Sequence, residues 1–306
     1  MQIGMVGLGK MGANMVRRLL QGGHDVVAFD LSAEARQEVA KEGSGTASTL
    51  AELAQKLSPP RVAWVMVPAG EPTTSTIRSL GSLLSEGDVV VDGGNSYFED
   101  ALAQARELQE SGIGFVDAGV SGGVWGLEVG YCLMVGGDAS VVAKVEPAFR
   151  TLAPEDGYAH VGPVGAGHFV KMVHNGIEYG MMQAYAEGFE LMGKAEEFGL
   201  DLHQIAGIWR YGSVVRSWLL ELIERALAPG AGFENVRGVV SDSGEGRWTV
   251  QQAVSRAVPL PVISAALFAR FASRDPDSLA ARLTAAQRNQ FGGHAMVLGT
   301  SSGDRQ

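Results

Sequence analysis

The sequence predicts an α/β protein, with a doubly wound parallel sheet over residues 1–163 and an all-helical domain over residues 164–306. Short apolar runs alternate with helix-like segments in the first half, as expected for parallel strands joined by helices. After Gly162 and Pro163 only helical patterns remain. The chain has 306 residues, enough for about two domains of roughly 150 residues each.

The predicted elements follow one another with short connections. Strands are expected at residues 3–6, 26–30, 61–67, 89–92, 115–118 and 132–135. Helices are expected between them at about residues 11–21, 33–41, 50–56, 74–84 and 141–152. In the second domain, the segment from Gly165 to about Glu197 is apolar almost all round, which predicts a long buried helix. Further helices are expected at residues 202–209, 214–227, 262–271 and 279–290.

Composition and charge exclude several classes of function. The formal net charge of −10 and the absence of a Lys/Arg run disfavour a general nucleic-acid-binding protein, because phosphate backbones require a basic surface. The N-terminus enters a strand directly, and no apolar stretch approaches about 18 residues, so neither a signal peptide nor a membrane span is expected. The single cysteine, Cys132, is expected in a buried strand, with no cysteine to pair with and no activating His or Lys beside it. These features predict a cytoplasmic protein.

A glycine-rich turn follows the first predicted strand. The run Gly7-Leu8-Gly9-Lys10-Met11-Gly12 has the GxGxxG spacing and opens the first predicted helix, while Asp30 ends the next strand. In this context the three glycines permit a tight turn, the approach of a pyrophosphate and close packing of helix on strand. The sequence therefore predicts a Rossmann-type domain that binds a dinucleotide at Gly7, Leu8, Gly9, Met11 and Gly12. The alternative is a structural turn that binds no nucleotide.

Asp30 predicts which dinucleotide binds. A carboxylate at this position accepts hydrogen bonds from the ribose hydroxyls of NAD and repels the 2′-phosphate of NADP. Leu31 and Ser32 follow it, so no arginine adjoins, and NAD is the predicted cofactor. Val67 and Pro68 end another strand at the same edge, where they are expected to pack on the ribose or adenine, unless they form a plain turn.

The long helix carries a polar face. Lys171, His174, Asn175 and Glu178 fall within an arc of about 80 to 100° at 3.6 residues per turn. On an otherwise apolar helix these groups would cost several kcal/mol unless they line a cavity or bind something. They are therefore candidate catalytic residues. An internal ion pair between Lys171 and Glu178 is the alternative.

Two loops bring small and polar residues to the predicted cofactor site. One follows the strand ending at Asp92 and contains Asn95, and the other contains Ser121, Gly122 and Gly123. Taken singly, each has the composition of an ordinary turn. Together with the helix face, they indicate a substrate site beside the cofactor.

Four stretches together resemble a known family. They are residues 7–14, 92–96, 120–123 and 165–179, and they resemble the decarboxylating 6-phosphogluconate dehydrogenases over nearly the whole chain. The wider β-hydroxyacid dehydrogenases share the glycine turn, the Ser-Gly-Gly loop and a Lys-xxx-Asn pair, but not the Gly-Ile-Glu-Tyr that follows Asn175. The chain lacks much of the helical domain of long members, so it resembles a short, NAD-preferring form.

The resemblance implies a reaction and a set of roles. Lys171 would take the C3 hydroxyl proton of 6-phosphogluconate during hydride transfer to NAD, and Glu178 would protonate C1 after loss of CO2, giving ribulose 5-phosphate. His174 and Asn175 would position the sugar and its carboxylate, as would the two loops at Asn95 and at residues 121–123. No metal is required. The resemblance leaves open whether the pathway is the pentose phosphate route or gluconate utilization.

The resemblance also implies a phosphate site. Tyr179 and Arg270 would bind the substrate phosphate together with Arg288 and His294 from the C-terminal tail of a partner subunit, which implies a homodimer or homotetramer. Alternatively, these arginines are solvated surface charges. The family's phosphate-binding lysine, in a longer loop, is missing from residues 242–249 of this chain.

Two other functions compete with this interpretation. A 3-hydroxyisobutyrate-type dehydrogenase would oxidise a smaller β-hydroxy acid without releasing CO2, but such a substrate has no phosphate and needs fewer cations than Arg270, Arg288 and His294 supply. A nucleotide-sensing binding module would need no acid and base on one helix face.

Overall fold

The chain divides into two compact units. The structure is a computed structural model that describes residues 1–275 and 277–297. The sheet unit comprises Met1–Glu178 and Gly244–Pro259, and the helical unit comprises Tyr179–Ser243 and the residues from Leu260 onward. The predicted boundary at residue 163 differs from this division, because the long helix begins against the sheet: a Cβ added to Gly167 would lie 2.3 Å from the Asp117 carbonyl oxygen.

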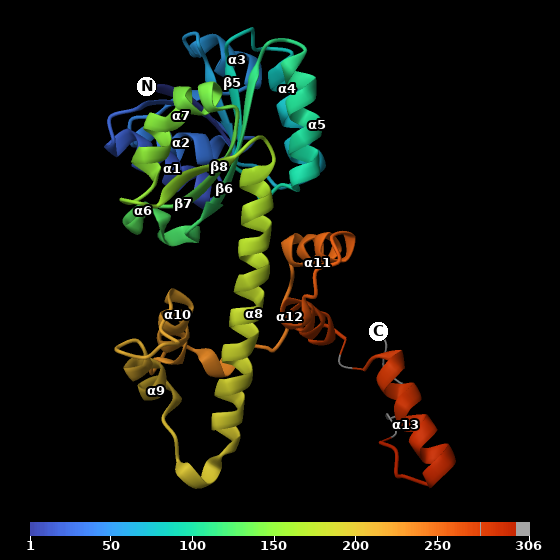
Figure 1. The fold of residues 1–306 in the computed structure, drawn as a ribbon. Helices are drawn as coiled ribbons and strands as arrows, with labels where there is room; N and C mark the ends of the chain where they lie inside the picture. The colour runs from blue at the N-terminus through green and yellow to red at the C-terminus, as the bar shows by residue number, and fades with distance from the viewer. Residues whose placement is uncertain (276, 298–306) are drawn as a thin grey trace. The chain divides into compact units, whose positions relative to one another are not determined.

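The sheet unit is built on an eight-stranded sheet of order β3-β2-β1-β4-β5-β6-β7-β8 (Figure 1). All neighbouring strands are parallel except β6 and β7. The strands are β1 (Gln2–Val6), β2 (Asp25–Phe29), β3 (Gly45–Ala47), β4 (Val62–Val65), β5 (Val89–Asp92), β6 (Gly114–Ser121), β7 (Cys132–Gly137) and β8 (Tyr158–Gly162). The six predicted strands and the Rossmann-type fold class are confirmed.

The second half of the sheet departs from the expected all-parallel arrangement. Residues 122–131, which include the short helix α6 (Gly126–Val129), join β6 to β7. A parallel crossover needs a dozen or more residues, so the chain turns back and β7 runs antiparallel to β6. The edge strands β3 and β8 were not predicted. β3 has three residues and β8 is mostly exposed, so neither carries an apolar run.

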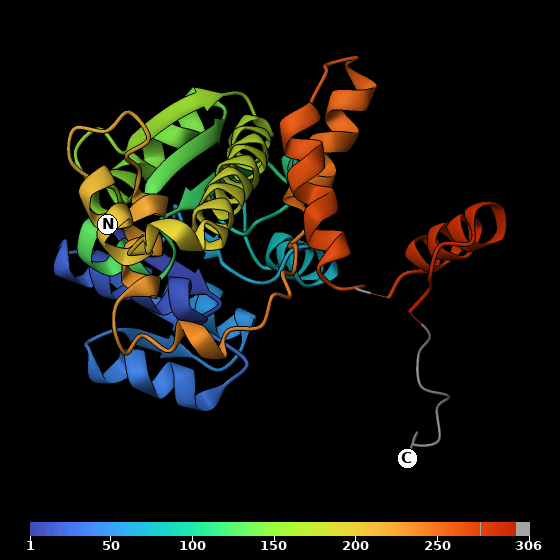
Figure 2. The same ribbon diagram turned by 90° about the horizontal axis from the view of Figure 1, so that it is seen from below.

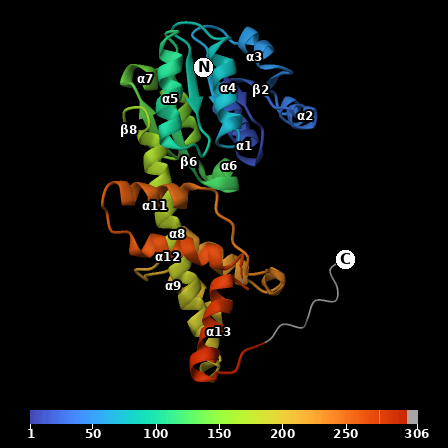
Figure 3. The ribbon, with the colours of Figure 1, turned by 90° about the vertical axis from the view of Figure 1, so that its right-hand side faces the viewer.

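Helices cover both faces of the sheet. One face packs against α1 (Lys10–Gln21), α2 (Ala33–Lys41) and α7 (Ala139–Leu152), with Met15, Val39 and Phe149 fully buried. The other packs against α3 (Leu50–Lys56), α4 (Glu71–Gly81) and α5 (Phe98–Gln109), and Figure 3 shows α4 beside α5. These two hydrophobic layers hold the carboxyl ends of the strands in place, where the predicted site residues lie.

The long helix α8 (Ala166–Lys194) is unbroken, and Figure 2 shows it foreshortened. Its first half packs against α11 (Glu245–Ser255), a helix that was not predicted. The Thr249 hydroxyl of α11 donates a hydrogen bond to the Met172 carbonyl at 2.9 Å. Gly176 makes the approach possible, because a Cβ there would lie 2.8 Å from the Thr249 methyl group. This packing places the first residue of α11 beside the polar face of α8.

The helical unit contains the second half of α8 with α9 (Leu202–Trp209), α10 (Trp218–Leu227), α12 (Pro261–Ala272) and α13 (Leu279–Gly292). Phe189, Ala206 and Leu220 form one buried cluster in it. The prediction that α8 is buried throughout was wrong for a single copy of the protein, since Leu191 is 74% exposed and Ile177 is 52% exposed. The described contacts cover only part of the circumference of α8. No helix within the described residues is long and apolar enough to cross a membrane.

Candidate active site

The glycine-rich turn between β1 and α1 has the geometry of a dinucleotide site. Gly7 has a φ of 99°, and a Cβ there would lie 2.4 Å from the Met66 carbonyl oxygen. A Cβ on Gly12 would lie 2.0 Å from the Gly7 carbonyl oxygen, whereas a Cβ on Gly9 would meet no atom within 4 Å. Gly7 and Gly12 are therefore required by packing, and Gly9 faces open space at the N-terminus of α1, where a pyrophosphate binds. The turn fits NAD.

Asp30 lies at the end of β2 and faces this turn. Its carboxylate accepts hydrogen bonds from the backbone N–H of Leu8 at 2.6 Å and of Ser32 at 2.8 Å. Arg36, one helical turn into α2, donates to the backbone carbonyls of Asp30 and Leu31. Inspection of the residues next to Asp30 missed this arginine, because α2 brings it back toward the strand end.

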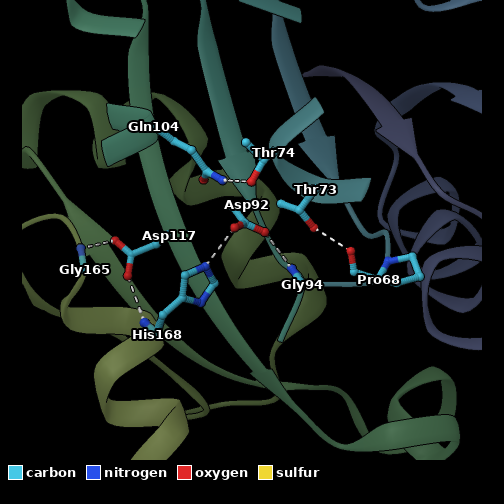
Figure 4. Close-up of polar contacts among 9 residues, drawn as sticks. All are labelled: Pro68, Thr73, Thr74, Asp92, Gly94, Gln104, Asp117, Gly165 and His168. Carbon is cyan, nitrogen blue, oxygen red and sulfur yellow. Dashed lines mark hydrogen bonds and ion pairs between the residues drawn. The ribbon is translucent and has the colours of Figure 1, made fainter. Parts of the chain in front are cut away.

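A buried ion pair fixes the start of α8 against the sheet (Figure 4). Asp92, at the end of β5, is fully buried, and its carboxylate lies 3.1 Å from Nε2 of His168. Asp117 of β6 accepts hydrogen bonds from the backbone N–H of Gly165 at 2.7 Å and of His168 at 2.8 Å. Two carboxylates thus hold the first turn of the helix that carries the candidate catalytic residues.

The environment of this pair favours its charged form. Burial by itself would lower the pKa of His168, but the carboxylates of Asp92 and Asp117 outweigh burial, so the pKa is raised. Burial would likewise raise the pKa of Asp92, but His168 and the Gly94 N–H outweigh it, so that pKa is lowered. Removing one partner would leave the other buried and uncompensated.

The segment between β4 and α4 holds Val67 and Pro68, the residues expected at the ribose or adenine. The Thr73 hydroxyl of α4 donates to the Pro68 carbonyl at 2.9 Å and anchors this strand end (Figure 4). Val67 is half-buried and Pro68 is exposed, at the sheet edge that carries Asp92. Their contact with a cofactor stays a prediction.

Lys171 brings a buried amine to the site. It is 7% exposed, and Gly119 of β6 lets α8 approach closely, because a Cβ on Gly119 would lie 2.5 Å from the Cβ of Lys171. Burial lowers the pKa of Lys171, and the nearby Glu178, Glu245 and Cys132 offset part of that effect. Over the described residues no ion pair joins Lys171 to Glu178. The Glu178 carboxylate instead lies 3.9 Å from Nδ1 of His174.

A chain of polar contacts runs from β6 to α11. Oγ of Ser121 lies 3.4 Å from Nε2 of His174, and Nδ1 of His174 lies 3.0 Å from Oδ1 of Asn175. Nδ2 of Asn175 donates to Oε1 of Glu245 at 3.0 Å. The structure thus brings three predicted residues together and adds Glu245, which sequence reasoning missed. An acidic residue in the first turn of a helix after Gly244 was the available signal.

Three more predicted site residues lie just after β5 and β6. Asn95 is exposed in the loop after β5, and Gly122 and Gly123 adopt positive φ angles of 134° and 54° after β6. Cys132 pairs with Ser121 across the β6–β7 ladder. The expectation that Cys132 is buried was wrong: it is exposed because it is the first residue of β7, before the covered part of the strand, whereas the five residues that follow it in β7 are buried.

Two domain matches decide the family. The NAD binding domain of 6-phosphogluconate dehydrogenase matches residues 2–162. The C-terminal domain of 6-phosphogluconate dehydrogenase matches residues 167–278. The chain belongs to the 6-phosphogluconate dehydrogenase family.

Relatives in this family differ in length. A Haloferax volcanii protein named 6-phosphogluconate dehydrogenase, NAD(+)-dependent, decarboxylating, is 45% identical over 299 residues, covering 97% of this chain and 99% of the relative. A Bacillus subtilis protein of the same name is 37% identical over 288 residues, covering 89% of this chain and 61% of the relative. The solved Plasmodium falciparum 6-phosphogluconate dehydrogenase has a TM-score of 0.83 at 26% identity, covering 99% of this chain and 67% of that chain. The sequence therefore matches a relative of similar length from end to end and spans less than two thirds of the longer Bacillus subtilis relative.

The residues expected at the phosphate of a 6-phosphogluconate dehydrogenase fall into two groups in the helical unit. The guanidinium of Arg270 stacks on the Tyr179 ring, 3.5 Å from its centroid, and donates to the Ser241 carbonyl at 2.9 Å. Arg288, in α13, and His294, just after it, are exposed. The structure therefore brings Tyr179 and Arg270 together, and the role of the other two stays a prediction.

The segment that lacks the family's phosphate-binding lysine has a definite structure. Asp242 pairs with Arg274 at 2.9 Å, and α11 begins three residues later at Glu245. The Glu245 carboxylate thus stands at the helix start beside the side-chain amide of Asn175. Among residues 1–275 and 277–297, no group of three or more His, Cys, Asp and Glu residues is arranged to hold a metal ion.

Proposed function

We propose that this protein catalyses the oxidative decarboxylation of 6-phosphogluconate to ribulose 5-phosphate and CO2, with NAD as the hydride acceptor. The observation that carries the proposal is the buried Lys171, whose pKa burial lowers, on the same helix face as a carboxylic acid, Glu178. Membership of the family and the named NAD(+)-dependent relative support the choice of substrate and cofactor.

In the proposed mechanism, Lys171 and Glu178 divide the proton transfers. Neutral Lys171 accepts the C3 hydroxyl proton as hydride leaves C3, giving a β-keto acid. Bound NAD supplies the acceptor for that hydride at C4 of its nicotinamide. Lys171, now protonated, donates to the C3 carbonyl oxygen while the C1–C2 bond breaks and CO2 leaves, which gives an enediol. Glu178 then protonates C1 of this enediol, the former C2 of the substrate, and Lys171 takes back the proton of the hydroxyl on the former C3, so that the ketone of ribulose 5-phosphate forms. Asn95, His174 and Asn175, with residues 121–123, position the sugar.

Tyr179 and Arg270 are proposed to bind the phosphate, assisted by Arg288 and His294 of a second copy of the chain. Arg270 is held by the Tyr179 ring and the Ser241 carbonyl, which presets its fork of donors for a phosphate. A homodimer or homotetramer would also cover the exposed apolar side chains of α8, such as Leu191. We further propose a cytoplasmic location, because both substrates of the reaction are diffusible metabolites.

Relative rates on three substrates test the proposal. NADH formation is measured by absorbance with 6-phosphogluconate, with gluconate and with 3-hydroxyisobutyrate. Turnover of 6-phosphogluconate at a much higher kcat/KM than either phosphate-free acid is expected. A preference for 3-hydroxyisobutyrate would leave the fold and cofactor assignments standing and replace the substrate assignment with the 3-hydroxyisobutyrate-type alternative.

Cofactor choice gives a separate prediction. The double variant Asp30→Asn, Leu31→Arg is expected to shift the ratio of kcat/KM for NAD over NADP toward NADP by at least about tenfold, or about 1.4 kcal/mol. The change removes a carboxylate that repels the 2′-phosphate and adds a guanidinium beside Arg36. Leu31→Arg alone is the control and should shift the ratio less, since Asp30 remains. An unchanged ratio in the double variant would refute the role of Asp30.

A further inference from the structure

Glu245 is buried beside the active site, and the proposed mechanism gives it no part. It is 2% exposed at the first position of α11. Its Oε1 accepts a hydrogen bond from Nδ2 of Asn175 at 3.0 Å, and its backbone carbonyl accepts one from the Thr249 hydroxyl. Thr249 also donates to the Met172 carbonyl, so the start of α11 is fixed to α8 on both sides of Asn175.

The direction of these hydrogen bonds determines which nitrogen of His174 carries a proton. Because the NH2 group of Asn175 faces the Glu245 carboxylate, its Oδ1 is the atom that faces His174. An amide oxygen only accepts, so Nδ1 of a neutral His174 must be the protonated nitrogen. Nε2 is then an acceptor, and it faces the Ser121 hydroxyl.

We propose that Glu245 is a positioning residue that, through Asn175, holds His174 in its Nδ1–H tautomer and thereby orients the Ser121 hydroxyl. With Nε2 accepting, Ser121 donates its proton to His174 and keeps its oxygen lone pairs for a substrate hydroxyl. In the opposite tautomer, Nε2 would donate to Ser121, which would then present its proton to the substrate. Glu245 thus sets the hydrogen-bond polarity of the sugar site.

The charged groups near these hydrogen-bonded residues also change the pKa of Lys171. Lys171 is faced by Glu178 on α8, Glu245 on α11 and Cys132 on β7, each of which raises the pKa that burial lowers. His174 is faced by Glu178 at 3.9 Å, besides Asn175 and Ser121. Replacing Glu245 with glutamine removes one negative charge near Lys171 but keeps an acceptor for Asn175, so the two effects can be separated.

The decisive test is the tautomer of His174 in the ligand-free protein, measured by 15N NMR with labelled histidine and assigned with His174→Gln. The wild type should show Nδ1 protonated, as should Glu245→Gln, whereas Glu245→Ala should shift the population toward Nε2–H. The remaining histidine resonances report that the variant is folded. An unchanged His174 tautomer in Glu245→Ala would overturn the proposal, and so would Nε2–H in the wild type.

Kinetics supply a second readout, which rests on the proposed function. Glu245→Ala should lower kcat with 6-phosphogluconate by about tenfold while KM for NAD stays unchanged. Glu245→Gln should mainly shift the acidic limb of the kcat/KM profile to lower pH, because the pKa of Lys171 falls further. Glu110→Gln, at an exposed carboxylate, is the matched control and should change neither kcat nor the pH profile of kcat/KM. Equal kcat values for wild type and Glu245→Ala would count against the proposal. A wild type inactive on this substrate would overturn only the proposed function, since the NMR result is independent of turnover.

Discussion

Replacing Lys171 with methionine is expected to lower kcat on 6-phosphogluconate by a factor on the order of 10³. Methionine fills a similar volume but accepts no proton, so it removes the proposed base from the C3 hydroxyl. In the wild type, kcat/KM should rise with pH as Lys171 loses its proton. That rise should lie below the ordinary lysine pKa of about 10.4, because burial lowers the pKa of this lysine. Initial-rate measurements of NADH formation across pH check both effects.

The matched control is Lys194→Met, at the exposed last residue of the same helix, which should retain wild-type kcat. Binding of NAD to Lys171→Met, followed by fluorescence titration, should also be unchanged, because Lys171 is not part of the glycine-rich turn. A Lys171→Met variant with kcat within a few-fold of wild type would rule out Lys171 as the base. The alternative in which Lys171 serves an internal ion pair with Glu178 predicts a loss of stability instead of a selective loss of kcat.

Replacing His168 with leucine is expected to lower the free energy of unfolding by about 3–5 kcal/mol, because it leaves the carboxylate of Asp92 buried without its partner. Asp92 is fully buried and lies 3.1 Å from His168. Water therefore does not compensate the Asp92 carboxylate for the lost charge of His168. Urea unfolding of the variant and the wild type at neutral pH measures the difference. The double variant Asp92→Asn, His168→Leu is the control and should recover much of the loss, since the unpartnered charge of Asp92 is removed. A loss below about 1 kcal/mol in the single variant would show that the pair is not buried as a charged pair.

The same pair predicts how stability depends on pH. The pKa of His168 is raised on folding, so its contribution is present below the unfolded value of about 6.5 and is lost as pH rises through the folded value. The pKa of Asp92 is lowered, so its contribution is present above about 3.9 and is lost as pH falls through the folded value. Stability from this pair should therefore be greatest between these limits, and His168→Leu should flatten the alkaline side of the profile.

Much of the fold follows from local patterns in the sequence. The predicted ranges 33–41, 50–56 and 202–209 match α2, α3 and α9 to the residue, because each has an apolar face and a Ser, Thr or Asp that accepts an N-cap hydrogen bond. The direction of β7 depends instead on the length of a connection, and the edge strands β3 and β8 depend on pairing with a neighbour. α11 was missed because its importance comes from packing on α8 and its own hydrophobic pattern is weak.

The candidate site shows the same division between local and tertiary information. Lys171, His174, Asn175 and Glu178 were found because helical spacing places them on one face. Partners supplied by other elements were not found: Glu245 reaches Asn175 from α11 and Asp92 reaches His168 from β5. In each case the contact joins residues at least 70 positions apart, and a single sequence carries no signal for such a pairing.

The measurement that tests the central claim most directly is the ratio of CO2 released to NADH formed by the wild type on 6-phosphogluconate labelled with 13C at C1. The account predicts one labelled CO2 for each NADH, with ribulose 5-phosphate as the only sugar product, because Lys171 and Glu178 carry the intermediate through decarboxylation to protonation at C1. NADH formation without labelled CO2 would contradict it and would make the protein a simple β-hydroxyacid dehydrogenase.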